Sequence, residues 1–190
     1  MGQYYRPTIL GDNGKIKATT IGWDWGCMGA KLMETSWVHN PMVNAVEQLL
    51  AGKFKGSRVV WAGDYADERE NGKTTYDMAS DDNATKVTDL VEVREVKYNN
   101  IPYKETDFVQ YKWVLNRDKK IAVEIPKYDS EGWNVHPLPI LTADGNGRGG
   151  GDYGGTAMEY VGAWAYDHIS VAKRLPKGYK KIDIRFAEDY

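Results

Sequence analysis

Residues 40–63 read NPMVNAVEQLLAGKFKGSRVVWAG and place a helix pattern directly before a strand pattern. Asn40 is a typical helix N-cap, and Pro41 suits the first helical position, where its missing N–H is not needed. Apolar residues then recur at helical spacing until Gly52. The pattern predicts an amphipathic helix over 41–51. The apolar run that follows predicts a buried strand over 58–62.

Strand patterns dominate the rest of the chain. The segment FVQYKWVLNRDKKIAVEI predicts a hairpin over 108–125, and further strands are expected at 1–10, 136–142 and 180–186. The segment 158–175 is either strand–turn–strand or partly helical, and Gly162 and the aromatic residues favour a strand over 158–164. A shorter helical stretch is expected over 30–37. The elements follow no βαβ rhythm, so the sequence predicts an α+β fold with a mainly antiparallel sheet. We expect one domain over 1–190, with a polar surface loop at 67–86 and a glycine-rich loop at 145–155.

Composition limits the classes of partner. The chain of 190 residues has 25 basic and 27 acidic residues and a net charge of −2, so a nucleic-acid partner is not expected. No run of 18 apolar residues predicts a membrane-spanning helix. The single cysteine, Cys27, excludes an intramolecular disulfide. Since MGQYYRPTIL lacks the apolar region of a signal peptide, the expected location is the cytoplasm.

The glycine-rich loop, GNGRGGGDYGG at 145–155, is the first candidate site. It formally contains G-x-G-x-x-G, but no helix pattern follows it, so a dinucleotide cofactor is not predicted. Backbone N–H groups of such a loop can instead converge on an anion, and an arginine can bind phosphate. The candidate ligand-binding residues are Gly147, Arg148, Gly149, Gly150, Asp152 and Tyr153. The competing interpretation is a flexible loop, or glycines that let another segment pass closely.

Polar residues around this loop are candidates for catalysis. Asp64 follows a predicted strand, Asp144 and Asp152 flank the loop, and His136 leads into it. Carboxylates at strand ends can act as general bases or bind a metal, and histidine is the usual general base near neutral pH. Aspartate is equally common in turns for local hydrogen bonding. The spacing matches no metal motif, so no metal site and no cofactor are predicted.

Seven tryptophans supply a third set of candidates. The segment 19–26 is either a short strand or a loop; as a strand, the alternation of Trp23 and Trp25 in GWDWG would place both on one face. With Trp37, Trp61 and Trp164, they either line a pocket for a base or sugar ring or belong to the core. In the polar segment DSEGWN, Trp133 is the tryptophan expected to be exposed, where it could contact a protein partner.

Several phrases of this sequence occur together elsewhere: MGQYY at the start, WAGDYAD at 61–67 and HPLPILTADGNGRGGGDY at 136–153. The chain thereby resembles a family of small proteins from bacteria and their phages. The resemblance extends from residue 1 to about residue 172 and excludes the charged segment 67–106. It implies a bacterial or phage cytoplasmic setting and transfers no catalytic residue.

Three functions follow from these features. The first is a binding module without enzymatic activity that holds a phosphorylated or nucleotide-like small molecule at the glycine-rich loop. The second is an accessory protein of a phage or mobile element that binds a host protein. The third is a hydrolase or transferase acting on a phosphorylated substrate.

Overall fold

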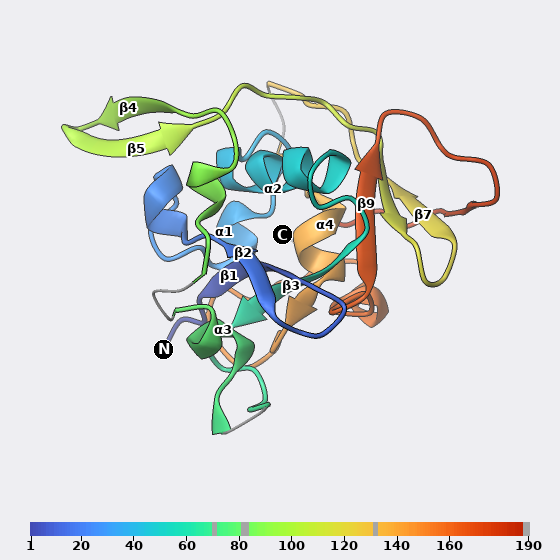
Figure 1. Cartoon of the computed structure of the whole chain (residues 1–190), viewed down its shortest axis with the longest axis horizontal. Helices are drawn as coiled ribbons and strands as arrows, with labels where there is room; N and C mark the ends of the chain where they lie inside the picture. The colour runs from blue at the N-terminus through green and yellow to red at the C-terminus, as the bar shows by residue number, and fades with distance from the viewer. Residues whose placement is uncertain (70–71, 81–83, 131–132, 188–190) are drawn as a thin grey trace.

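The computed structural model describes residues 1–69, 72–80, 84–130 and 133–187, and its main sheet is built around β3 (Ser57–Gly63) (Figure 1). One edge of β3 pairs antiparallel with β1 (Tyr5–Leu10). Its other edge pairs antiparallel with β9 (His168–Ala172) and parallel with β8 (Ala143–Asp144). The strand order is β10-β7-β6-β9-β3-β1-β2, with β8 beside β3.

The remaining strands complete this sheet and form a second, smaller one. β2 (Ile16–Thr19) forms a hairpin with β1, and β6 (Trp113–Asn116) forms the predicted hairpin with β7 (Ile121–Glu124). β10 (Lys180–Ile182) lies parallel to β7. β4 (Arg94–Tyr98) and β5 (Ile101–Glu105) pair only with each other and project from the body (Figure 1). The prediction of an α+β fold with a mainly antiparallel sheet is confirmed.

The longest helix, α2 (Pro41–Ala51), has the predicted bounds. The Asn40 side chain accepts hydrogen bonds from the N–H groups of Met42 and Val43, which satisfies two donors that the first turn leaves open. The shorter helices are α1 (Leu32–Thr35), α3 (Thr75–Met78) and α4 (Pro137–Leu141), and 3₁₀ turns occur at η1 (Gly22–Trp25), η3 (Val87–Asp89) and η4 (Met158–Tyr160). Among the described residues, no helix has the length and apolarity that crossing a bilayer requires.

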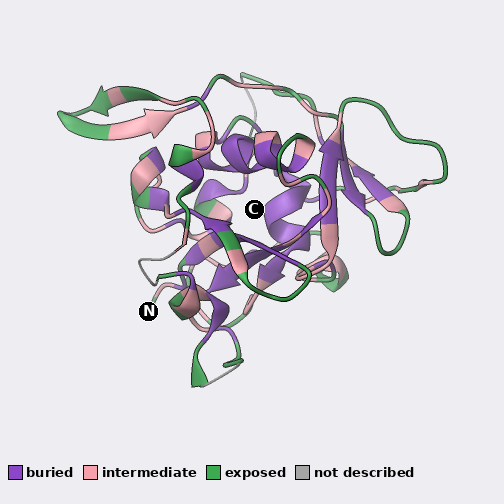
Figure 2. Cartoon of the chain, in the orientation of Figure 1, coloured by how far each residue is buried: buried purple, intermediate pink, exposed green. Residues whose placement is uncertain are grey.

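The alternating side chains of β3 face two different layers. Val59 and Trp61 belong to the main core, which contains the apolar faces of α2 and α4 (Figure 2). Val60 and Ala62 point to the opposite face, where Tyr166 and the helix α3 cover them. Both faces of β3 are therefore buried, as its continuous apolar sequence predicts.

Three local predictions are wrong. The strand expected at 136–142 is the helix α4, because His136 caps it and prolines are tolerated in a first helical turn. The strand expected at 158–164 is η4 followed by turns, with Gly162 at φ +72°. Trp23 and Trp25 lie in η1 rather than a strand, so they do not share a face: Trp23 is 61% exposed and Trp25 is 1% exposed.

The polar loop expected at 67–86 contains α3, whose N-cap Thr74 forms a capping box with Asp77. Thr74 and Thr75 are buried, so this part of the segment packs against the sheet instead of standing free in solvent. Positions 70–71 and 81–83 of the predicted loop lie outside the described residues.

Replacing the α2 cap tests how much this helix start contributes. We expect Asn40→Ala to lower the free energy of unfolding by about 1–2 kcal/mol, because two N–H groups of a buried first turn lose their acceptor. Asn40→Ser keeps a hydroxyl acceptor, so its free energy of unfolding should fall less than that of Asn40→Ala. Urea unfolding measures both variants. Asn13→Ala, which removes an acceptor in an exposed turn, is the control, and an equal loss in Asn13→Ala and Asn40→Ala would contradict the assignment.

Candidate functional site

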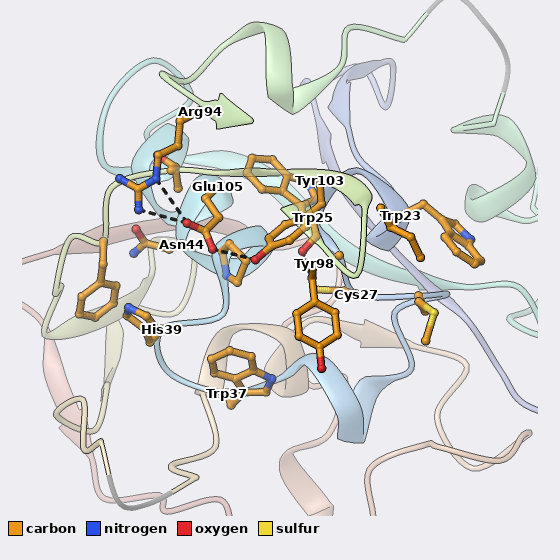
Figure 3. A pocket seen from close by; sticks show the side chains of 16 residues that line it. Trp23, Trp25, Cys27, Trp37, His39, Asn44, Arg94, Tyr98, Tyr103 and Glu105 are labelled. Carbon is orange, nitrogen blue, oxygen red and sulfur yellow. Dashed lines mark hydrogen bonds and ion pairs between the residues drawn. The ribbon is translucent and has the colours of Figure 1, made fainter. Parts of the chain in front are cut away.

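A pocket of about 500 Å³ opens beside the β4–β5 hairpin (Figure 3). Three parts of the chain enclose it: the η1 turn with the residues that follow it, the segment 37–44 that leads into α2, and the hairpin with residues 106–108. Aromatic and apolar side chains dominate its walls, with a few polar groups among them. Its size and lining are those of a small-molecule site.

Aromatic rings form the walls of this pocket. Trp25 is buried, and its indole N–H donates to the Thr20 hydroxyl at 2.7 Å. Tyr103 of β5 packs on Gly26, where a Cβ would lie 3.1 Å from the tyrosine ring. Gly26 also has φ +71°, a conformation that favours glycine. The glycine therefore lets the hairpin approach η1 closely enough to close one side of the pocket.

Polar groups lie together on the hairpin side of the pocket (Figure 3). Arg94 donates to Glu105 through Nε and Nη2, at 3.3 and 3.1 Å, and to Asp107 through Nη1 at 2.9 Å. The Tyr103 hydroxyl donates to Glu105 at 3.2 Å. Burial and the Glu105 carboxylate raise the pKa of Tyr103, so the phenol stays protonated at neutral pH. The pocket thus offers a charged donor and a charged acceptor beside its rings.

His39 holds an unusual backbone conformation at the edge of the pocket, with φ +78°. Its ring stacks on Tyr128 at 4.5 Å and meets the edge of Phe108 at 4.7 Å. Trp37 lies beside it and contacts Trp133 at 5.3 Å between ring centroids. Left-handed backbone at a non-glycine residue is costly and often occurs at functional positions. The aromatic lining of the pocket therefore continues as a strip of rings in contact with one another.

The glycine-rich loop forms the predicted nest of N–H groups, and its own aspartate fills it. The N–H groups of Gly147, Arg148 and Gly149 donate to Asp152 Oδ2 at 2.6, 2.8 and 2.9 Å. The other carboxylate oxygen of Asp152 accepts from the Tyr5 hydroxyl at 2.7 Å. An external anion at this loop would have to compete with Asp152 for all three N–H groups.

The same loop packs against the first residues of the chain. Gln3 N–H donates to the Gly150 carbonyl, and Gly150 N–H donates to the Met1 carbonyl, each at 3.0 Å. A Cβ at Gly149 would lie 2.5 Å from the Gln3 Cβ, and a Cβ at Gly145 would lie 2.5 Å from the side-chain nitrogen Nε2 of Gln3. Gln3 is fully buried. The glycines therefore let another segment pass closely, which is one of the two interpretations that the sequence left open.

Arg148 binds a protein carboxylate. Its guanidinium donates to both oxygens of Asp67, at 2.7 and 2.9 Å, and to the Tyr65 carbonyl at 3.0 Å. The hydrogen bonds and charge of Arg148 hold the pKa of Asp67 below its usual range. The pair links the glycine-rich loop to the segment after β3.

The acidic candidates lie near the hydroxyl groups of Tyr5 and Tyr166. Asp64 accepts from the Tyr4 N–H at 3.0 Å, and Asp144 accepts from the Tyr166 hydroxyl at 2.6 Å. Burial, then the hydrogen bond to Asp144, raises the pKa of Tyr166 to about 12. Burial and the carboxylates of Asp152, Asp64 and Asp144 raise the pKa of Tyr5 in the same direction. Among the described residues, no three His, Cys, Asp or Glu side chains are placed to hold a metal ion.

Two other candidates are buried and hydrogen-bonded. His136 is 1% exposed: its Nδ1 accepts from the Leu138 N–H at 3.1 Å, and its Nε2 lies 3.0 Å from Glu47 Oε1. The Tyr153 hydroxyl donates to backbone carbonyls, those of Thr156 and Ala187. His136 therefore caps the helix α4, and Tyr153 joins the glycine-rich loop to the last described residues of the chain.

The structure divides the candidate tryptophans. Trp23 and Trp37 line the pocket, and Trp61 and Trp164 are buried in the main core. Trp25 belongs to both, since it lines the pocket and packs in the main core. The hairpin residues of the pocket were not among the sequence candidates. The signal for them is the pair Asn99-Asn100, both at positive φ between β4 and β5, because such a pair is typical of a two-residue hairpin turn.

Comparison of the full chain with known protein families, with curated proteins and with solved structures finds no match. The site is therefore interpreted from its own geometry.

Removing the carboxylate from the nest tests its structural contribution. We expect Asp152→Ala to lower the free energy of unfolding by about 2 kcal/mol or more, because four donors lose a charged acceptor. Asp152→Asn keeps one carbonyl oxygen for the N–H groups, so its free energy of unfolding should lie between those of Asp152→Ala and the unchanged protein. Urea unfolding at pH 7 measures both. Unchanged stability in Asp152→Ala would show that the nest does not depend on this aspartate.

The raised pKa of Tyr166 predicts a stability loss at alkaline pH. A group whose pKa rises from 10.0 to about 12 on folding stabilises the protein below pH 10 and loses that contribution as the pH rises to 12. We expect the unfolding free energy of Tyr166→Phe to fall less steeply over this window than that of the unchanged protein. Tyr98→Phe, at an exposed tyrosine, is the control. Identical slopes in all three proteins would refute the assignment.

Proposed function

We propose that this chain is a small-molecule binding module whose ligand carries a flat ring and binds in the aromatic pocket between η1, the start of α2 and the β4–β5 hairpin. The observation that carries the proposal is the pocket of about 500 Å³ lined by three tryptophans and two tyrosines. Rings of this kind stack on planar ligands and contribute apolar area at the same time. Arg94 and Glu105, which pair with each other, give the pocket a charged side next to its rings.

The glycine-rich loop is not the binding surface in this proposal. Its converging N–H groups hold Asp152, and its arginine holds Asp67. No residue of 145–155 lines the aromatic pocket. A phosphorylated ligand at the loop stays a prediction that would require Asp152 to move away. A hydrolase or transferase likewise stays a prediction, and it would require His136 to leave its buried contact with Glu47.

A protein partner is the second candidate function. Large apolar side chains are exposed around the pocket mouth: Trp23 at 61%, Met28 at 67%, Tyr98 at 71% and Ile101 at 62%. Trp133, 75% exposed, stands at the end of the aromatic strip. Contiguous exposed aromatic surface is typical of protein interfaces. A host protein of a phage or mobile element would contact this rim.

Ligand binding is measured by intrinsic tryptophan fluorescence and thermal shift with nucleobases, nucleosides and indoles. We expect at least one ring class to quench fluorescence and raise the melting temperature. Trp23→Ala, at an exposed ring of the pocket, should weaken that binding about three- to tenfold, since one aromatic contact contributes roughly 0.5–1.5 kcal/mol.

Trp133→Ala is the matched control, because it removes an exposed tryptophan that does not line the pocket. It should bind the same ligand as tightly as the unchanged protein. If no ring compound binds, the small-molecule proposal fails. If both alanine variants lose capture of one defined host protein, the partner proposal replaces it.

A further inference from the structure

Basic residues are concentrated at one end of the main sheet. The segments 112–124 and 167–183 contain nine Lys or Arg and four Asp or Glu residues. The rest of the chain then holds 16 basic and 23 acidic residues. A net charge near zero for the whole chain therefore combines a positive end with a negative remainder.

Strand pairing brings these segments together. β6 pairs with β7 and with β9, and β10 runs parallel to β7, so the loop after β9 crosses the β6–β7 hairpin to reach β10. Tyr179 of this loop packs on the hairpin cluster that contains Trp113 and Leu115. Figure 1 shows β7, β9 and this loop on the side of the molecule away from the β4–β5 hairpin.

The acidic residues of this end are mostly engaged in ion pairs. Glu124 lies between Lys112 and Lys181, at 3.5 and 2.8 Å. Asp167 pairs with Lys119. Asp118 contacts His168 at 2.8 Å. These carboxylates therefore neutralise the charges of Lys112, Lys119, Lys181 and His168, and other cations of this end have no ion-pair partner among the described residues.

The uncompensated cations form what we call the basic end: Arg117, Lys120, Lys173, Arg174, Lys177 and Lys180. All six are exposed, and among the described residues none of them has an ion-pair partner. Arg117 donates to the Lys55 carbonyl, which brings the exposed loop with Lys53 and Lys55 alongside. Lys120 lies over the ring of Tyr179 at 5.4 Å. Asp183, which lies near Lys181, is the one carboxylate of these two segments without an ion pair among the described residues, so the six cations outnumber it.

We propose that the basic end binds the phosphate backbone of double-stranded nucleic acid. Clustered lysines and arginines without ion-pair partners can neutralise phosphates of a polyphosphate chain, and the counterions that this releases favour binding. The proposal departs from the expectation set by net charge, because the charge that matters is local. It is independent of the aromatic pocket, because the β4–β5 hairpin that lines the pocket lies on the other side of the molecule (Figure 1).

The chemistry of the surface favours a duplex over two other polyanionic partners. An interfacial membrane site requires exposed apolar side chains beside its cations, and here the large apolar side chain that is exposed is Leu175, at 37%. Single strands are held by stacking on open aromatic rings, whereas Trp113 is buried and lies beneath Lys112 and Lys181. Phosphate contacts alone give binding that does not depend on sequence.

Protection of an exposed sheet edge does not explain the arrangement. Lysines on an edge strand prevent unwanted pairing, and Lys180 and Lys181 of β10 fit that purpose. Lys173, Arg174 and Lys177 lie in the loop between β9 and β10, where no strand edge is present. Their charge therefore needs a separate reason.

The test uses fluorescence anisotropy of the full chain with a labelled 20-base-pair DNA duplex, titrated at several salt concentrations. We expect binding at low salt that weakens steeply as salt rises. The variant Lys173→Gln/Arg174→Gln/Lys177→Gln should bind at least tenfold more weakly at low salt. Its slope of log K against log salt should become shallower by up to about 3, since each lost phosphate contact changes the slope by about 0.9.

The matched control is Lys86→Gln/Lys97→Gln/Lys104→Gln, which removes three positive charges outside the basic end. It should bind as the unchanged protein does, and thermal unfolding should show both variants folded. Absence of duplex binding at low salt overturns the proposal, and so does an equal loss in the two variants. Binding to phosphatidylserine vesicles without binding to the duplex would also overturn it, by assigning the basic end to a membrane surface.

Discussion

Burial of β3 on both faces and pairing along both of its edges is the constraint on which the rest of the structure depends. Val59 and Trp61 determine where α2 and α4 pack, and Val60 and Ala62 determine what covers the opposite face. Every hydrogen-bonding group of such a strand needs a partner, because water cannot reach it. The strands β1, β8 and β9 supply those partners from distant parts of the sequence. The order of the sheet follows from that requirement.

Local signals predicted the elements that local chemistry determines. The α2 helix was predicted to the residue, because a cap, a proline and an apolar stripe agree there. The strand predicted at 136–142 was wrong because its two prolines also suit a first helical turn, and the choice depends on the contact between His136 and Glu47, 89 positions apart. Contacts of that separation leave no local pattern in a single sequence.

The candidate site shows the same division. The sequence left a nest of N–H groups around an anion as one of several interpretations of the glycine-rich loop, and it could not show that the anion is Asp152 of the same loop. It left the tryptophans open between a pocket and the core, and so did not separate Trp23, at the pocket, from Trp61 and Trp164, in the core. Whether a ring faces a cavity or a core depends on which segment packs across from it. For this pocket that segment is the β4–β5 hairpin, whose residues are exposed or half-buried and show no apolar stripe.

The separateness of this hairpin has a consequence for how the protein can diversify. β4 and β5 pair with each other and contribute no strand to the main sheet, yet they supply one whole wall of the pocket. Substitutions or changes of length in 94–105 would therefore alter the shape of the cavity at little cost to the core around β3. Related chains could therefore keep the main sheet and vary the β4–β5 hairpin, so that each evolves a different ligand preference.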